Sequence, residues 1–179
     1  RTSGEPMQVD VCVATYKRTG LLEKLLQSLI RQQIDQGVAI RIVVVDNDIA
    51  ESARNVVKRY AAMSEVPIHY ETEPVQNIAL ACTRALTACS GDYVAFIDDD
   101  EEATPKWLQH LLDAIRRFQA DVVFGPVLPL YPENTPEWVR RGRFFERDRR
   151  HTGVSCPHGA AGNVLISRKT IIATGLQFN

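Results

Sequence analysis

Short apolar runs alternate with longer amphipathic segments along most of this sequence, a pattern typical of alternating strands and helices. The apolar runs predict strands at residues 9–14, 40–45, 66–70, 93–97, 122–124 and 163–166. Between them, apolar residues recur at helical spacing over 21–30, 53–61, 78–88 and 107–118. The alternation predicts an α/β fold with a mostly parallel sheet, in a single domain spanning residues 1–179.

Two of the predicted helices carry start signals in the sequence. Thr19 is predicted to cap the first helix through its side-chain oxygen. Thr104 is predicted to cap the helix of 107–118, with Pro105 at the first helical position, where the missing N–H of proline is no loss. After residue 124 the pattern weakens, and a series of prolines indicates a loop.

The composition supports a folded domain and excludes several kinds of partner. A chain of 179 residues with 45% hydrophobic residues can bury a sizeable core. Its formal net charge of −1 gives no general attraction to nucleic acid or to an anionic membrane. The four cysteines show no metal-ligand spacing, so we expect reduced thiols in the cytoplasm.

Neither membrane insertion nor secretion is indicated by the sequence. No apolar run reaches the roughly 20 residues that a transmembrane helix needs, and the N-terminus has no signal-peptide pattern. The chain begins without Met and stops at Asn179. We therefore expect a fragment of a longer protein, truncated in its C-terminal part.

Carboxylates gather directly after the fourth predicted strand. Asp98, Asp99 and Asp100 follow it without a break, and Glu101 and Glu102 come next. Carboxylates this close repel one another unless a cation or hydrogen-bond donors compensate them, and oxygen ligands suit Mg²⁺ or Mn²⁺. Ligands bind at the carboxyl ends of strands in open α/β sheets. This acidic run is therefore the strongest indication of chemistry in the chain.

A second polar cluster, Asp46-Asn47-Asp48, ends the predicted strand of 40–45. Parallel strands would bring this cluster to the same edge as the three aspartates. One cluster could then hold a metal while the other accepts hydrogen bonds from a base or a ribose. Helix capping is the alternative for Asp48, but it explains three consecutive aspartates less well, because a cap needs only one carboxylate.

Three segments carry a family resemblance: Val-Asp-Val-Cys-Val-Ala-Thr-Tyr-Lys-Arg at 9–18, Val-Val-Val-Asp-Asn-Asp at 43–48 and Tyr-Val-Ala-Phe-Ile-Asp-Asp-Asp-Glu at 93–101. In this order they resemble the motifs of the family 2 inverting glycosyltransferases with the GT-A fold, in particular bacterial members that build exopolysaccharides. The resemblance extends over residues 8–175. It implies a nucleotide-binding part at 8–127 and the start of an acceptor-side part at 128–179.

The resemblance also implies roles for residues of the nucleotide pocket. Thr15, Tyr16 and Arg18 would line this pocket after the first strand, and Asp46 would accept a hydrogen bond from the base. The segment 159–163 resembles the glycine-containing turn on the acceptor side, where glycine lets the backbone approach the sugar; an ordinary loop is the alternative.

For the acidic run, the resemblance implies a DxD motif. Asp98 and Asp99 would contact the ribose and the sugar. Asp100, with Asp98 as a second ligand, would hold the Mn²⁺ or Mg²⁺ that bridges the diphosphate. The metal would neutralise charge that builds up on the leaving group.

The sequence departs from the family pattern in two places. Many relatives carry a nucleotide-contacting Arg where this chain has Cys82, and Arg84 would point elsewhere on its helix. Inverting transfer also needs a general base, which relatives carry in an acidic motif downstream of the strand that starts at Asn163. The sequence ends before any such motif, so its catalytic base is unknown.

Two other polar features have both a functional and a plain interpretation. His151 and His158 flank the glycine-containing turn and could approach the diphosphate or metal, although solvated surface histidines are the commoner case. The arginine-rich stretch from Arg140 to Arg150 is either a solvated loop or a lid or patch for the phosphates of a lipid-linked acceptor.

The sequence thus predicts a metal-dependent inverting glycosyltransferase that moves a sugar from a nucleotide-diphospho sugar, preferably UDP-linked, to a saccharide or lipid-linked acceptor. We expect it in the cytoplasm or peripherally at the inner face of the membrane. A sugar-1-phosphate nucleotidyltransferase is less favoured, because no glycine follows the first strand until Gly20. A phospho-accepting receiver domain would need acidic residues where Thr15 and Tyr16 stand. A non-catalytic donor-binding remnant stays open.

Overall fold

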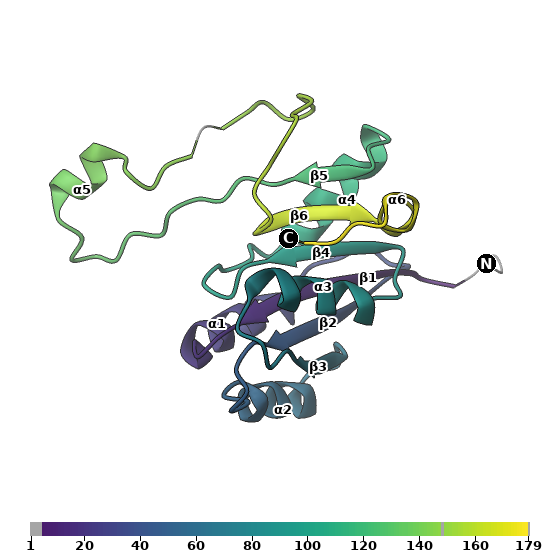
Figure 1. Cartoon of the computed structure of the whole chain (residues 1–179). Coiled ribbons are helices and arrows are strands. Elements are labelled where there is room, and N and C mark those ends of the chain that lie inside the picture. The colour runs from purple at the N-terminus through teal and green to yellow at the C-terminus, as the bar shows by residue number, and fades with distance from the viewer. Residues whose placement is uncertain (1–4, 148, 179) are drawn as a thin grey trace.

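The computed structural model describes residues 5–147 and 149–178. Within them, a six-stranded mixed sheet runs in the order β3-β2-β1-β4-β6-β5 (Figure 1). Strands β1 to β4 are parallel, whereas β6 pairs antiparallel with both β4 and β5. The strands are β1 (Met7–Thr15), β2 (Val38–Asp46), β3 (Ile68–Thr72), β4 (Tyr93–Ile97), β5 (Val122–Phe124) and β6 (Asn163–Ser167). The α/β fold and mostly parallel sheet predicted from the sequence are confirmed.

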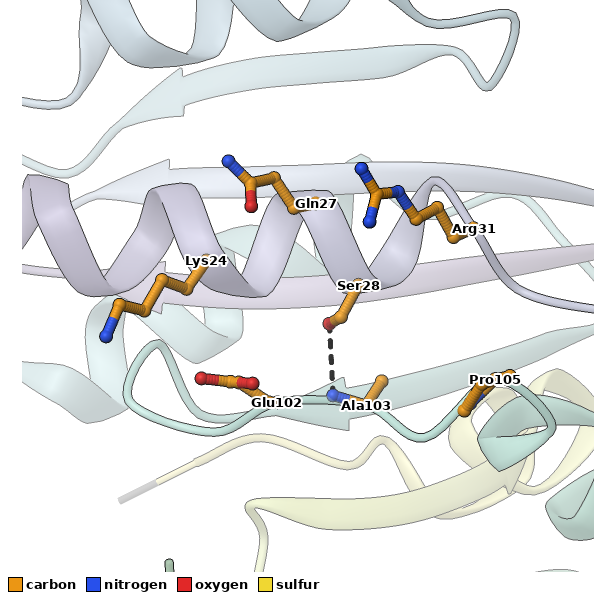
Figure 2. Close-up of a pocket in the computed structure, with 7 residues that line it drawn as sticks. All are labelled: Lys24, Gln27, Ser28, Arg31, Glu102, Ala103 and Pro105. Atoms are coloured by element: carbon orange, nitrogen blue, oxygen red, sulfur yellow. Dashed lines mark hydrogen bonds between the residues drawn. The ribbon is translucent and has the colours of Figure 1, made fainter. Parts of the chain in front are cut away.

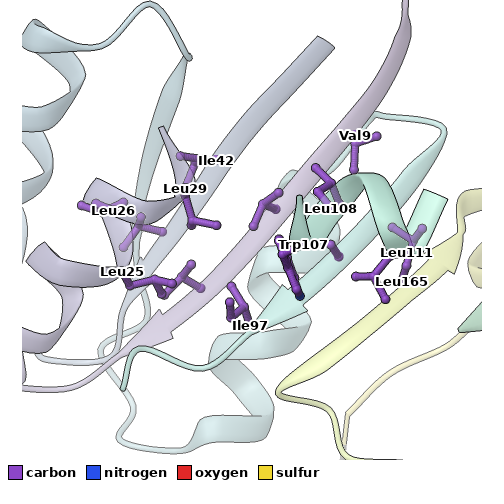
Figure 3. Close-up of a cluster of buried hydrophobic side chains, with 14 of the residues drawn as sticks. Val9, Leu25, Leu26, Leu29, Ile42, Ile97, Trp107, Leu108, Leu111 and Leu165 are labelled. Atoms are coloured by element: carbon purple, nitrogen blue, oxygen red, sulfur yellow. The ribbon is translucent and has the colours of Figure 1, made fainter. Parts of the chain in front are cut away.

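Helices cover both faces of the sheet. They are α1 (Thr19–Leu29), α2 (Arg54–Met63), α3 (Ile78–Ala88), α4 (Trp107–Arg117), α5 (Glu137–Gly142) and α6 (Arg168–Thr174). One buried cluster joins α1, α2 and α4 to the sheet, and Figure 3 shows its leucines packed around Ile97 and Trp107. A second cluster packs α3 on the opposite face, around Cys12 and Phe96. No helix of the described residues is long and apolar enough to span a bilayer.

The directions of the strands gather the chain's polar ends at one edge of the sheet. Thr15 pairs with Asp46, so β1 and β2 end side by side. Ile97 at the end of β4 pairs with Asn163 at the start of β6, because these two strands are antiparallel. Strand β5, antiparallel to β6, ends at the same edge. The acidic run, the turn after β1 and the segment that joins β5 to β6 therefore all meet there.

Most element positions agree with the sequence predictions. Strands β4 and β5 and helix α3 occupy the predicted residues, while β1 and β2 extend beyond the predicted ends. Strand β3 begins two residues late, at Ile68; Pro67 just before it has no N–H to donate to the sheet, although its carbonyl accepts a hydrogen bond from Ile42. The short helices α5 and α6 were not predicted.

Both predicted threonine caps are wrong. Thr19 is the first residue of α1; Arg18 is in the N-cap position and makes no side-chain cap bond. Helix α4 begins at Trp107, two residues after Pro105, because Thr104 forms a backbone turn by accepting from the Trp107 amide at 2.9 Å. Residue type alone therefore does not identify the N-cap of either helix.

Candidate functional site

An open cleft of about 450 Å³ lies at the edge where β1, β2 and β4 end. It brings together the predicted Thr15, Tyr16 and Arg18 with the acidic run. Its lining consists of Ala14, Thr15, Tyr16, Arg18, Asn47, Gln76, Asn77, Ile78, Asp98, Asp99 and Asp100. The turn after β1 and the acidic run after β4 therefore lie at one cleft, and that this cleft is a nucleotide pocket stays a prediction.

Asp99 links the acidic run to the end of β1. Its carboxylate is buried and accepts a hydrogen bond from the Thr15 hydroxyl at 2.7 Å and one from the Arg18 guanidinium at 3.2 Å. Each carboxylate oxygen of Asp99 therefore already has a protein partner. The arrangement fixes the floor of the cleft, and the predicted contact of Asp99 with the ribose or sugar stays a prediction.

Asp100 and Asp98 present their carboxylates to solvent at the cleft. Arg18 also donates to Asp100 at 3.3 Å, but both side chains are about half exposed, so water screens this ion pair. The surrounding protein reduces the hydration of Asp98, and repulsion from Asp100 and Asp99 adds to this effect. Together they raise the pKa of Asp98 above its usual value.

Glu101 continues the same excess of negative charge. Burial, with further repulsion from Asp98 and Asp100, raises the pKa of Glu101 to about 7. Arg147 opposes the shift by favouring the charged forms of Glu101 and Asp98. A carboxylate cluster of this kind favours the arrival of a cation.

The carboxylates of Asp98 and Asp100 at the cleft fit a divalent ion that also binds oxygen atoms of a ligand. Among the described residues, no group of three or more His, Cys, Asp or Glu side chains is arranged to enclose a metal. Mg²⁺ is usually held by one or two carboxylates together with substrate phosphates, and not by an all-protein cage. Asp100 and Asp98 supply such carboxylates beside an open cleft.

Gly162 brings the glycine-containing turn against the acidic run. A Cβ atom at this position would lie 2.3 Å from Oδ2 of Asp98 and 3.0 Å from Oε1 of Glu101. Both atoms are carboxylate oxygens at the ends of side chains, so any larger residue at this position would displace Asp98 and Glu101. The backbone at 159–163 lies close to the site, and its contact there is with the side chain of Asp98.

Asp46 lies beneath the cleft and does not line it. It is fully buried and accepts hydrogen bonds from the Tyr70 hydroxyl at 3.0 Å and from the amides of Ala53 at 2.7 Å and Asp48 at 3.1 Å. Burial, with the hydrogen bond to Asp46, raises the pKa of Tyr70 to about 12. Asp46 thus ties the end of β2 to α2 and β3. The predicted base contact of Asp46 stays a prediction.

Asp48 does not cap the next helix. Its carboxylate accepts from the amide of Ala50 at 3.1 Å, inside the loop. Ala53 is at the N-cap position of α2 and makes no side-chain cap bond. The capping alternative considered for Asp48 is therefore wrong.

Asn47 belongs to the polar cluster predicted at the end of β2, but no role of its own was predicted for it. Its buried side chain donates to the carbonyls of Glu73 at 2.8 Å and Val75 at 2.6 Å, and accepts from the amide of Asn77 at 2.9 Å. Asn77 in turn caps α3 by accepting from the amides of Ala79 and Leu80. Asn47 therefore holds the wall of the cleft that residues 73–77 form.

Cys82 and Arg84, where the sequence departs from the family pattern, do not line the cleft. Arg84 donates to Glu73 at 3.0 Å and lies 3.7 Å from Glu71. It does not line the cleft, in agreement with the prediction. Cys82 is partly buried, and its burial, with the charge of Asp98, raises the pKa of the thiol to about 11. A thiol of this kind supplies no positive charge to a nucleotide.

The far end of the acidic run turns away from the cleft. Glu102 lines a second, smaller hollow of about 270 Å³ beside α1, together with Lys24 and Arg31 (Figure 2). There Ser28 accepts a hydrogen bond from the amide of Ala103 at 3.0 Å. The five carboxylates after β4 therefore do not all serve one site. His151 and His158 are exposed, and neither lines the cleft.

Comparison with known proteins agrees with this geometry. Residues 10–174 match the family described as Glycosyl transferase family 2. The succinoglycan biosynthesis protein ExoM of Rhizobium meliloti is 33% identical over 180 residues, which are 97% of this chain and 56% of ExoM. The glucosyl-dolichyl phosphate glucuronosyltransferase of Haloferax volcanii is 24% identical, over 96% of this chain and 52% of that protein.

Solved structures share the fold. The structure of S. aureus TarS in complex with UDP-GlcNAc has a TM-score of 0.75 at 17% identity, covering 97% of this chain and 49% of TarS. The mannosyltransferase PcManGT of Pyrobaculum calidifontis, in complex with GDP-Man and Mn²⁺, has a TM-score of 0.67 at 19% identity, covering 96% of this chain and 48% of PcManGT. These neighbours identify the fold as GT-A.

The chain spans about half the length of the curated relatives it matches. The family match nevertheless extends over nearly all of its own length, and it includes every residue that lines the cleft. This chain belongs to glycosyl transferase family 2.

Proposed function

We propose that this chain binds the donor in a glycosyltransferase that moves a sugar from a nucleotide-diphospho sugar, preferably UDP-linked, to an acceptor hydroxyl with inversion. The observation that carries the proposal is the open cleft where Asp98 and Asp100 face the turn of Thr15 to Arg18. Support also comes from a relative named for succinoglycan biosynthesis and from a neighbour that binds UDP-GlcNAc. Family membership favours neither the nucleotidyltransferase nor the receiver alternative.

In this proposal the cleft binds the nucleotide diphosphate and prepares it to leave. Asp100 and Asp98 would hold Mn²⁺ or Mg²⁺, which when bound neutralises charge on the diphosphate. Thr15, Tyr16 and Arg18 would line the nucleotide pocket, and the guanidinium of Arg18 is positioned to bind a phosphate oxygen. All residues that line the cleft lie within 8–127. Residues 128–179 would form the start of the acceptor-side part.

The acceptor in this proposal is a saccharide or a lipid-linked saccharide. A lipid-linked acceptor would bring the protein to the inner face of a membrane. Transfer also needs a general base to deprotonate the acceptor hydroxyl, and we assign that role to no residue of this chain.

Calorimetric titration of UDP in the presence and absence of Mn²⁺ tests the donor site. We expect binding that needs the metal and that Asp100→Ala weakens at least tenfold, because one of two protein carboxylates on the ion is lost. Glu65→Ala is the matched control, since Glu65 is an exposed carboxylate just before β3, at the opposite edge of the sheet.

Two results would contradict the site assignment: UDP binding without any metal dependence, and equal binding by Asp100→Ala and the unchanged chain. A transfer assay with UDP-sugars and a saccharide acceptor then separates an enzyme from a donor-binding remnant. A remnant would bind UDP with Mn²⁺ and release no UDP from UDP-sugars.

A further inference from the structure

The segment between β5 and β6 forms a long excursion from the sheet. We call residues 126–147 and 149–161 the arm. Figure 1 shows it extending away from the layered body, with α5 at its far side. Helix α5 has no buried residue, so it packs into no core. Most of the described residues of the arm are exposed.

Both ends of the arm are fixed at the cleft. The amide of Gly125 donates to the carbonyl of Asn163 at 2.9 Å, and the Asn163 side chain donates to the carbonyl of Pro126 at 2.9 Å. The indole of Trp107 on α4 donates to the same Asn163 side chain at 2.9 Å. At the other end, Gly162 touches Asp98 of the acidic run. The arm is therefore tethered beside the cleft at both ends, while α5 lies away from the body.

Large apolar side chains of the arm face water. Leu130 is 73% exposed, Trp138 68%, Phe144 66% and Phe145 64%. Single exposed apolar residues are common, but a gathering of large ones on a protruding segment marks an interaction surface. The same segment contains no buried leucine or isoleucine to compensate for this exposure.

Aromatic contacts hold these side chains together without covering them. The rings of Trp138 and Phe144 meet edge-to-face with centroids 6.1 Å apart. Those of Tyr131 and Phe145 lie 6.5 Å apart, and the Arg140 guanidinium stacks over the Tyr131 ring at 5.5 Å. The result is a clustered aromatic surface. Side chains that already contact one another lose less conformational entropy on entering an interface than separate side chains would.

The charge of the arm is opposite to that of the body. Over residues 126–161 the sequence has six arginines against four acidic residues, a net charge of +2, while the whole chain has −1, which leaves −3 for the rest. Arg141 pairs with Glu137 and Arg143 with Glu146. Arg149 and Arg150 are exposed, and no ion pair joins them to a described residue. An anionic surface would therefore attract the arm and repel the body.

We propose that the arm docks this protein on the surface of a bilayer rich in anionic lipid. Trp138, Phe144 and Phe145 enter the interface between headgroups and acyl chains, where aromatic side chains are favoured. Arginines of the arm bind lipid phosphates through paired N–H donors. The acceptor-side role of this docking rests on the proposed function, since it would present the cleft to a lipid-linked acceptor.

Co-sedimentation with lipid vesicles tests the docking surface. We expect the chain to sediment with vesicles of equimolar phosphatidylcholine and phosphatidylglycerol, more weakly with phosphatidylcholine alone, and less as salt rises. Replacing Trp138, Phe144 and Phe145 with Ser should weaken binding by roughly tenfold for each ring withdrawn from the interface. Arg149→Gln with Arg150→Gln should weaken binding to the anionic vesicles about fivefold per arginine and leave the weak phosphatidylcholine binding unchanged.

Exposed residues of the body provide the matched controls. Met63→Ser with Ile172→Ser removes apolar side chains that are 71% and 68% exposed, and Arg116→Gln with Arg117→Gln removes two exposed arginines of α4. Both control pairs should keep full vesicle binding. The proposal is overturned if the chain sediments with neither vesicle, or if a control pair lowers binding as much as the arm variants.

A second copy of the chain is the competing occupant of the arm. Sedimentation velocity showing a dimer that the triple Ser variant abolishes, without vesicle binding, would overturn the proposal in favour of self-association. The vesicle assay contains no nucleotide or metal, so its failure would leave the UDP titration unaffected. A failed UDP titration would in turn leave the docking surface unaffected.

Discussion

Asp10 in the middle of β1 offers the sharpest test of how the cleft is supported. Its carboxylate is fully buried and accepts four hydrogen bonds: two from Arg41, at 2.9 and 3.0 Å, and one each from the amides of Ser90 at 2.7 Å and Gly91 at 2.8 Å. Arg41 lies on β2, and Ser90 and Gly91 precede β4. One carboxylate therefore joins β1 to both of its parallel neighbours, whose ends form the cleft.

Asp10→Ala should destabilise the fold by about 3–5 kcal/mol, the usual cost of removing one partner of a buried ion pair. The variant leaves the Arg41 guanidinium, whose side chain is only 27% exposed, and the amides of Ser90 and Gly91 without their acceptor. A domain of this size has a total stability of about 5–15 kcal/mol. The loss should lower the melting temperature by roughly 6–20 °C.

The same carboxylate should make stability depend on acid pH. Burial alone would raise the pKa of Asp10, but the Arg41 guanidinium and the amides of Gly91 and Ser90 outweigh it and hold the pKa below its usual value. A lowered folded pKa contributes stability above the unfolded value of about 3.9, and this contribution is lost as pH falls through the folded pKa. Below about pH 4 the difference between the unchanged chain and Asp10→Ala should therefore shrink.

Urea unfolding followed by circular dichroism, at pH 7 and in steps down to about pH 3, measures both effects. Glu137→Ala is the control, because its ion pair with Arg141 is exposed on α5 and should change the free energy of unfolding by no more than the error. The reasoning fails if Asp10→Ala costs less than about 1 kcal/mol, or if its cost does not change between neutral and acid pH.

Two further predictions concern the cleft itself. Asn47→Asp keeps the size of the side chain but replaces the donor to the Glu73 and Val75 carbonyls with an acceptor. In calorimetry it should weaken metal-dependent UDP binding about tenfold or more. The control Asn134→Asp, in the exposed arm, should leave this binding unchanged. Gly162→Val places a Cβ atom 2.3 Å from Oδ2 of Asp98 and should displace that carboxylate. We expect an unchanged circular dichroism spectrum and a sharp fall in Mn²⁺ binding, measured by isothermal titration with UDP. Unchanged binding would contradict the close packing of this turn.

The sequence predicted the sheet well where strands are buried on both faces. The run before Asp98 is continuously apolar because Phe96 faces one core and Ile97 the other, and such a run has few alternative structures. The ends of helices were predicted less well. Thr19 has the residue type of a cap, but whether its side chain turns toward the helix depends on the turn before it, where Lys17 has a φ of 55°.

At the site, residue types were easier to predict than their roles. Asp98, Asp99 and Asp100 are alike in sequence, yet Asp99 is buried beside Thr15 while Asp98 and Asp100 are exposed. The three residues lie in a turn, where the Asp98 carbonyl accepts from the Glu101 amide, so no strand alternation predicts which of them points inward. The structural role of Asn47 was not predicted because its partners are backbone groups more than twenty-five positions later, and backbone groups leave no signature in a sequence. The Asn47 side chain takes its position only when β2 packs beside the segment 73–77 that precedes α3.

Strand β6 has a consequence for how this protein can diversify. It returns the chain to the sheet by antiparallel pairing, and a single residue, Asn163, anchors the start of that return to β5 and α4. The segment inserted before it can therefore change in length or composition without shifting the register of β1, β2 and β4. Under the proposed function, exchange of that segment as a unit would change the acceptor side and leave the donor cleft unchanged.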